Sequence, residues 1–401
     1  MSAALPRSRR TLSAPVLVRA CNRIAAILLL GVLPPLLLLV ILIGSYRSGT
    51  GAWAIDFKGN FYVPGREILD GFSPYHPDYL LRVRAAVEAG HKPDEFHEGV
   101  FAAYPAPGLV LGVPFSLLPV AVAEWIWAGL MVAAGFLSLR IAGVRDWRVY
   151  GAALLTPAAL SSVLFGAVDL ALMLGLAICW RWRDHAGRAG VALGAIIALK
   201  LVAAPLIAWL LVTRRFRAAA IAALTAAGLW LGGWALIGFD GLSSYPHLLS
   251  TLTAIEDDRG YSPVAYANLI GITGGLASAM PYIAGGALLA LLWVVSRRRE
   301  GGDAAAFLVG VLSVLAFSPI VWHHYLVLLF VPLAVYSPRL APSWFLPLVC
   351  WVVWRGAFFY TGWAERIVFL IVIAGIAVWA LRRTPPATEV APPAGTLPAW
   401  R

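Results

Sequence analysis

Long apolar segments separated by shorter polar ones run along nearly the whole chain. A membrane-spanning helix needs about 20 mainly apolar residues, and lipid allows only helices or closed barrels to span because the backbone must pair internally. The weak alternation typical of barrel strands is absent. The pattern therefore predicts an all-α polytopic membrane protein with spanning segments at 24–44, 121–142, 149–165, 168–182, 190–212, 217–238, 279–296, 304–320, 323–337, 343–359 and 363–382.

The remaining segments complete the predicted organisation. Residues 45–104 form a large polar loop after the first span, and the short, proline-interrupted apolar stretch 105–118 is predicted to be a re-entrant helix that dips into the membrane. The arm 1–23 is predicted to be cytoplasmic, and so is the tail 383–401, whose composition is typical of disordered sequence. Residues 24–382 are predicted to form a single transmembrane domain.

Composition supports this class of protein. The chain is 61% hydrophobic and 13% charged, with a mean hydropathy of +0.81, whereas soluble domains carry about 25% charged residues. The net charge of +11 does not indicate nucleic acid, because Lys and Arg fall in short clusters between the spans. Cys21, Cys179 and Cys350 have neither a metal-binding nor a disulfide spacing.

The basic clusters also predict the orientation, since they mark cytoplasmic loops. With a cytoplasmic N-terminus, all of them lie inside only if 190–212, which has a basic cluster at each end, bends near Pro205 into two short helices. A single crossing there would put one cluster outside. The bend gives about 12 crossings with both termini cytoplasmic, and it places 45–104 on the outer face together with Asp169, Lys200 and the turn before His323.

The outer loop contains the first candidate for chemistry. Eight of the 20 acidic residues lie between Asp56 and Glu98, and Asp56 follows the first span by about a dozen residues. A carboxylate at the membrane surface, partly removed from water, has the raised pKa that suits a general base. The alternative is an ordinary loop or helix-capping aspartate.

Other polar residues at the ends of spans are weaker candidates. Lys200 lies in an apolar segment, where an ionisable group indicates function by default, although its side chain can also snorkel to the interface. Asp169 is either a helix N-terminal acid or a site residue. His323 and His324 either contact a phosphate or substrate or belong to an aromatic belt, and adjacent helical positions do not easily share one metal ion.

Several signatures are missing. The chain has no Walker motif, no Rossmann glycine fingerprint and no zinc pattern. A nucleotide-dependent reaction is therefore disfavoured, and no cofactor and no metal are predicted.

The order of the motifs resembles a known family. An early aspartate in the outer loop, Asp56, is followed by Asp70-Gly-Phe-Ser-Pro-Tyr75, Tyr104-Pro-Ala-Pro107, Lys200-Leu-Val-Ala-Ala-Pro205 and Ser318-Pro-Ile-Val-Trp-His-His324. From about Ile24 to Leu381 the chain is similar to glycosyltransferase family 87, which has the GT-C fold and contains bacterial mannosyltransferases that use polyprenyl-phosphate mannose. The family's Gly-Gln-x-Asn element reads Gly166-Ala-Val-Asp169 here.

The resemblance implies roles for the candidate residues. A hexose, mannose by family default, would pass with inversion from a polyprenyl-phosphate donor to a glycolipid or glycan acceptor at the outer face of the bacterial cytoplasmic membrane, without metal or protein partner. Asp56 would be the general base. Donor phosphate contacts are expected from Lys58, Lys200, His323, His324 and Arg355, and substrate or acceptor contacts from Tyr62, Asp70, Tyr75, Tyr104, Asp169 and Trp322.

Two other functions fit a polytopic chain. A transporter or lipid-linked sugar flippase usually shows repeated halves and a binding site at the bilayer midplane, whereas here no repeat is evident and the polar residues gather at the outer face. A non-catalytic membrane scaffold would make the acidic loop a surface feature only.

Overall fold

The computed structural model describes residues 14–49, 53–75, 103–256, 260–353 and 362–386, and within these ranges every regular element is a helix. The first group of elements comprises α1 (Ala14–Ala26), the π-helix η1 (Ile27–Val32), α2 (Leu33–Ser48), α3 (Ile55–Phe57), the π-helix η2 (Lys58–Tyr62), α4 (Val63–Leu69), α6 (Ala106–Val110) and α7 (Val113–Ser116). The middle group comprises α8 (Val120–Ile141), α9 (Trp147–Leu154), α10 (Pro157–Phe165), α11 (Asp169–Arg181), α12 (Ala186–Leu199), the 3₁₀ helix η4 (Leu201–Ala203), α13 (Leu206–Val212) and α14 (Phe216–Leu236). The last group comprises α15 (Tyr245–Glu256), α16 (Pro263–Leu269), α17 (Gly274–Ser296), α18 (Gly302–Phe317), the 3₁₀ helices η5 (His323–Leu329) and η6 (Pro342–Val352), α19 (Phe330–Tyr336) and α20 (Trp363–Leu381).

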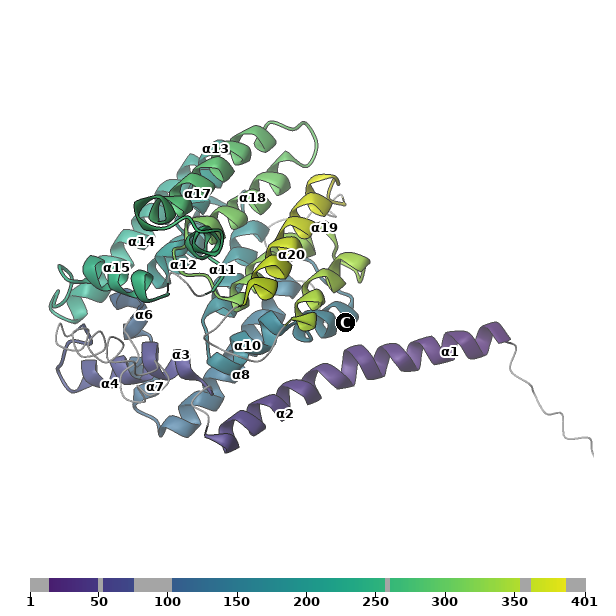
Figure 1. Ribbon diagram of the computed structural model, residues 1–401, viewed down its shortest axis with the longest axis horizontal. Coiled ribbons are helices and arrows are strands. Elements are labelled where there is room, and N and C mark those ends of the chain that lie inside the picture. The colour runs from purple at the N-terminus through teal and green to yellow at the C-terminus, as the bar shows by residue number, and fades with distance from the viewer. Residues whose placement is uncertain (1–13, 50–52, 76–102, 257–259, 354–361, 387–401) are drawn as a thin grey trace, which may run out of the picture.

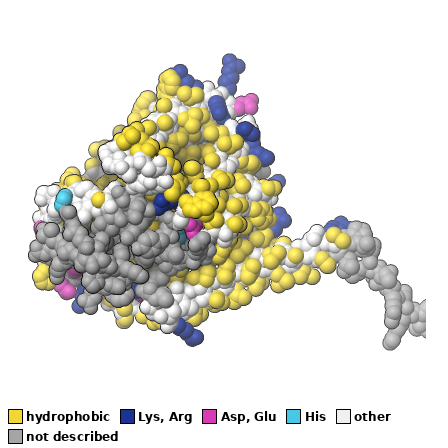
Figure 2. All heavy atoms as spheres, viewed as in Figure 1, with side chains coloured by type: hydrophobic (Ala, Val, Ile, Leu, Met, Phe, Trp, Pro, Cys, Tyr) yellow, Lys and Arg dark blue, Asp and Glu magenta, His cyan; other side chains and the backbone are white. Residues whose placement is uncertain are grey.

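Five of the described helices are long and apolar enough to cross a membrane: Val18–Ser48, Val120–Ile141, Phe216–Leu236, Gly274–Ser296 and Trp363–Leu381. The first of them is α1, η1 and α2 in one continuous rod, which runs beneath the body of the molecule and extends beyond it (Figure 1). Hydrophobic side chains cover much of the visible surface of the body and of this rod (Figure 2). These features agree with the predicted all-α polytopic membrane protein, and the number of 12 crossings stays a prediction.

Three segments depart from the continuous helices that the apolar pattern predicts. Segment 149–165 is bent by 69° between α9 and α10. The bend forms because Thr156 caps α10 by accepting the backbone N–H of Ala159, and Pro157 cannot continue α9. The re-entrant stretch 105–118 consists of two short helices, α6 and α7, instead of one, and segment 323–337 begins as a 3₁₀ helix before it becomes α19.

Segment 190–212 turns back on itself, as the sequence predicts. Helix α12 and helix α14 run parallel, because Gly190 lies against Ala218 and Gly194 lies against Ala222. A Cβ atom on either glycine would come within 2.7 Å of a carbonyl oxygen of α14, so the absence of a side chain is what lets the two backbones approach. The chain must therefore reverse between the end of α12 and the start of α14, and η4 and α13 provide this return.

The basic clusters converge at one end of the helices. Arg183 and Arg215 both bind the Asp303 carboxylate, with N–O distances of 2.7–2.9 Å, and the indole N–H of Trp209 donates to the same carboxylate at 3.0 Å. Lys and Arg side chains line the upper and right-hand edge of the molecule in Figure 2. Helix α11 starts at Asp169 and ends at Arg181, so about 20 Å of helix separates the basic end from the end that holds the candidate site.

Candidate functional site

The segment that carries Asp56 is fixed to the helix bundle on both sides. The backbone N–H of Ala54 donates to the Leu164 carbonyl of α10 at 2.8 Å, and Phe57 is fully buried against Gly166. Ala54 has a φ of +52°, a left-handed conformation that costs a non-glycine residue about 1–2 kcal/mol. Such strain persists only where the surroundings enforce it, and it gathers at functional sites.

Glu124 of α8 forms a second attachment for this segment. Its buried carboxylate accepts the indole N–H of Trp53 at 2.8 Å and lies 3.4 Å from Nζ of Lys58. The two partners flank Asp56 in the sequence, three residues before it and two residues after it. Glu124 therefore holds both sides of the turn that presents Asp56, and Lys58, predicted to bind donor phosphate, has an internal counter-ion.

Four charged or titratable side chains from distant segments meet at this end of the bundle. Nζ of Lys200 lies 3.5 Å from Oδ1 of Asp169, and Nε2 of His324 lies 3.3 Å from Oδ2 of the same carboxylate. Asp56 interacts electrostatically with Lys200 and Asp169. The structure thus brings together Asp56, Asp169, Lys200 and His324, which the sequence places between 31 and 268 residues apart.

Aromatic rings enclose the Lys200 ammonium. Its Nζ lies 4.1 Å from the ring centroid of Tyr325 and 5.1 Å from that of Tyr104, within the range of cation–π attraction. Lys200 itself follows the last residue of α12 in an extended conformation, so its side chain leaves the helix end and points at the other groups. Tyr325 was not predicted as a site residue, although it directly follows the Ser318–His324 motif.

Burial sets the acidity of Asp56, which lies in α3, between the first long helix and the bundle. Loss of water raises the pKa of its carboxyl to about 7, with Lys200 opposing this change and Asp169 adding to it. An aspartate with this pKa is partly ionised at neutral pH and still basic enough to take a proton from a hydroxyl group in a transition state. Burial also raises the pKa of the Tyr104 hydroxyl, which stays protonated.

The two histidines of the motif differ in their surroundings. His324 is buried against Asp169, whereas His323 is half-buried, and both rings lie edge-on to Phe165. The backbone before them is held because the N–H of Tyr261 donates to the Val321 carbonyl at 2.7 Å. The geometry therefore assigns the contact with Asp169 to His324.

Other predicted site residues contact the protein itself. The hydroxyl of Tyr75 donates to the Tyr104 carbonyl at 2.7 Å, and the ring of Tyr75 stacks on Trp234. The hydroxyl of Tyr62 donates to the Leu118 carbonyl at 2.8 Å, and the exposed Asp70 pairs with Arg66 of the preceding turn.

These contacts shape the loop, and the substrate roles predicted for these residues stay predictions. Trp322 is half-buried at the start of η5. Arg355 lies outside the described residues.

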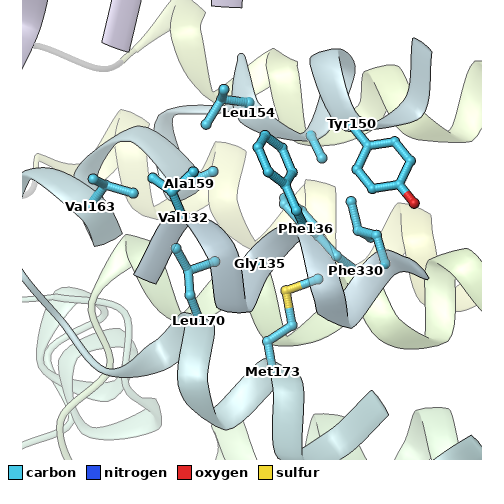
Figure 3. Close-up of a pocket in the computed structure, with 12 residues that line it drawn as sticks. Val132, Gly135, Phe136, Tyr150, Leu154, Ala159, Val163, Leu170, Met173 and Phe330 are labelled. Carbon is cyan, nitrogen blue, oxygen red and sulfur yellow. The ribbon is translucent and has the colours of Figure 1, made fainter. Parts of the chain in front are cut away.

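An apolar pocket lies between helices of the bundle. It has a cavity volume of about 30 Å³ and is bounded by α8, α9, α10, α11 and α19, with Val132, Phe136, Leu170 and Met173 among the side chains that point into it (Figure 3). One lining residue, Leu170, directly follows Asp169 in α11, whereas none of the four cluster residues lines the pocket. Its apolar lining supplies no chemical group and fits hydrocarbon. Among the residues that the structure describes, no three His, Cys, Asp or Glu side chains form a metal-binding group.

Comparison with known proteins gives one match. The family model of glycosyltransferase family 87 matches residues 101–319, which is more than half of the chain. The matched range includes Tyr104, Asp169 and Lys200, whereas Asp56 and His324 lie outside it. No curated protein and no solved structure matches the chain.

Proposed function

Because the chain belongs to glycosyltransferase family 87, we propose that it transfers a hexose from a polyprenyl-phosphate donor to a hydroxyl group of a glycolipid or glycan acceptor. Mannose is the sugar that the family resemblance favours. The observation that carries the proposal is the proximity of a half-buried carboxylate with a pKa of about 7, Asp56, to a half-buried ammonium, Lys200, at one end of an apolar helix bundle. These are the two groups that transfer from a phosphate leaving group requires.

The reaction is a single displacement at the anomeric carbon. Asp56 takes the proton of the acceptor hydroxyl as the acceptor oxygen bonds to that carbon, and the bond from the carbon to the phosphate oxygen breaks with its electron pair going to the phosphate. The donor phosphodiester carries one negative charge and the released polyprenyl phosphate carries two, while Asp56 changes from charged to neutral. The net charge of the site is thus unchanged, and inversion follows from attack opposite the leaving group.

Lys200 and His324 stabilise the phosphate as its charge grows. A lysine ammonium binds phosphate as a point charge, and Lys200 is held by rings and a carboxylate so that it need not reorganise during the reaction. His323, Lys58 and Arg355 remain proposed phosphate contacts, and no metal ion takes part.

The distribution of charge supports an outward-facing site. The arginine clusters lie at the helix ends opposite Asp56 and Lys200, and basic clusters mark the cytoplasmic side of a membrane protein. We therefore place the reaction at the outer face of the cytoplasmic membrane, where a polyprenyl-phosphate donor and a glycolipid acceptor meet within the bilayer.

The proposal is tested with purified protein, polyprenyl-phosphate mannose and a set of glycolipid acceptors. Wild-type protein is expected to form a mannosylated product and free polyprenyl phosphate. Asp56→Asn is expected to lower kcat by about 10²–10⁴-fold, the usual contribution of a general base. The matched control is Asp184→Asn, because the Asp184 side chain is 76% exposed at the basic end of the bundle.

Two outcomes contradict the proposal. Full activity of Asp56→Asn would remove Asp56 as the base. Movement of a fluorescent polyprenyl-phosphate sugar across proteoliposome membranes, without transfer to any acceptor, would favour a flippase instead.

A further inference from the structure

Asp169 is a carboxylate buried beside Lys200 and His324. Its side chain is 0% exposed, and the Lys200 ammonium lies at the outer limit of hydrogen-bond distance from one of its oxygens. The nearest cationic groups, Lys200 and His324, lie 3.5 and 3.3 Å away, longer than the 2.7–2.9 Å of a charge-assisted hydrogen bond. Burying a carboxylate is costly unless cationic groups pair with it, and Lys200 and His324 supply this pairing for Asp169.

The exposed fractions of the side chains show that Asp169 lies deeper in the protein than Lys200 and His324. The side chains of Lys200 and His324 are 17% and 4% exposed, and that of Asp169 is not exposed at all. A substrate that enters the site therefore meets Lys200 before it can reach Asp169. Direct contact with acceptor or donor, which the sequence suggested for this residue, conflicts with this order of burial.

The position of Asp169 links three segments of the chain. It is the first residue of α11, where the helix dipole favours a negative charge. It contacts Lys200 at the end of α12 and His324 at the start of η5. The negative charge of Asp169 attracts the Lys200 ammonium and so helps to hold it between the rings of Tyr104 and Tyr325.

We propose that Asp169 is a positioning residue for the transfer reaction: its carboxylate holds Lys200 and His324 at the wall of the site and acts on Asp56 through its charge, without touching substrate. This inference rests on the proposed function. The contact with Nε2 of His324 favours the tautomer with a proton on that nitrogen. One ammonium proton of Lys200 points to Asp169 and a second to the Tyr325 hydroxyl, which leaves the third for a phosphate.

The effect of the Asp169 charge on the pKa of Asp56 can be separated from the effects of the other groups that face Asp56. They are Asp169 of α11, Lys200 after α12, Tyr104, and Tyr325 of η5. Among them, the negative charge of Asp169 raises the pKa of Asp56, whereas the ammonium of Lys200 lowers it. Removing the Asp169 charge therefore lowers the pKa of the base.

The test compares Asp169→Asn, which keeps the size of the side chain, with the wild type and with the control Asp184→Asn. The kcat of Asp169→Asn is expected to fall at least tenfold. The acidic limb of its kcat/KM profile is expected to move to lower pH, so that the ratio of the rate at pH 6 to that at pH 8 rises. If Asp169 had only a structural role, its replacement would lower the rate equally at every pH. An acidic limb of the kcat/KM profile at the same pH as in the wild type would therefore refute the proposed effect of the Asp169 charge on Asp56.

A double-mutant cycle tests whether Asp169 acts through Lys200. If it does, Asp169→Asn has little further effect in a Lys200→Met background, measured as binding of sugar-free polyprenyl phosphate to the purified, monodisperse variants. Additive losses in binding would overturn the positioning role, and so would a fully active Asp169→Asn.

The measurement of polyprenyl phosphate binding also distinguishes a failure of this inference from a failure of the proposed function. If wild-type protein binds polyprenyl phosphate but transfers no sugar, the proposed function fails and the cycle still decides the role of Asp169. If the wild type neither binds nor transfers, both are refuted.

Discussion

Replacement of Asp56 by Asn is expected to stabilise the folded protein at neutral and alkaline pH. Burial raises the pKa of the carboxyl to about 7 in the folded state, whereas an aspartate in an unfolded chain titrates near 4. As pH rises, the unfolded state releases its proton first, so ionisation favours unfolding. The resulting cost is absent below about pH 4, grows between about pH 4 and 7, and is constant above about pH 7.

The size of this cost follows from the difference between the two pKa values. About three pKa units, at about 1.4 kcal/mol each, give a cost of roughly 4 kcal/mol above pH 7. Asn does not titrate, so Asp56→Asn removes the whole pH-dependent part. Any change in packing or hydrogen bonding caused by the amide is independent of pH in this range and therefore separates from the charge effect.

Thermal unfolding of the purified protein in detergent measures this difference. The 17 tryptophans provide an intrinsic fluorescence signal. The Tm advantage of Asp56→Asn over the wild type is expected to be small at pH 4.5 and several degrees larger at pH 8, whereas Asp184→Asn, at an exposed site, should show the same Tm difference at both values. A Tm difference for Asp56→Asn that does not grow with pH would show that Asp56 is ionised at little cost, and the reasoning about its basicity would fail with it.

Three further results are expected. The wild-type rate should fall about tenfold per pH unit below pH 7, because only ionised Asp56 acts as a base; a flat rate down to pH 5, measured by product formation, would contradict this. Glu124→Gln should keep most activity because its amide oxygen still accepts from Trp53, whereas Glu124→Ala should lower kcat about tenfold or more in the same assay; equal activities would exclude the attachment. Asp303→Ala should destabilise the protein by about 1–3 kcal/mol, because Arg183, Arg215 and Trp209 lose a shared, partly exposed acceptor; the unfolding midpoint in denaturant tests this, and an unchanged midpoint would show the pair to be dispensable.

The sequence predicted which residues gather because helix ends alternate between two faces of a membrane. Counting arginines predicts a face for each helix end and puts Asp56, Asp169, Lys200 and His324 on the same predicted face, and the structure brings these four side chains together. The bend near Pro205 followed from the same rule, and the parallel packing of α12 and α14 agrees with it.

The partners of individual side chains could not be predicted in the same way. Glu124 stood out in the sequence only as a polar residue near the start of an apolar helix, and nothing local indicates that Trp53 and Lys58 are its partners. Tyr75 was expected to contact substrate, yet its hydroxyl donates to a backbone carbonyl 29 residues further along the chain. Such contacts depend on how distant segments pack, which hydrophobic periodicity does not encode.

The arrangement of charges resolves a conflict within the proposed reaction. A phosphate leaving group needs a cation close to the anomeric carbon, but a cation close to the attacking hydroxyl lowers the pKa of the base beside it. Lys200 exerts this effect on Asp56, and burial together with Asp169 opposes it. Asp169 is less exposed than Lys200. Its negative charge therefore offsets the effect of the ammonium on the pKa of Asp56 from the inner side, while the partly exposed ammonium remains open to a phosphate. A single lysine can then stabilise the leaving group without making Asp56 too weak a base for an acceptor hydroxyl.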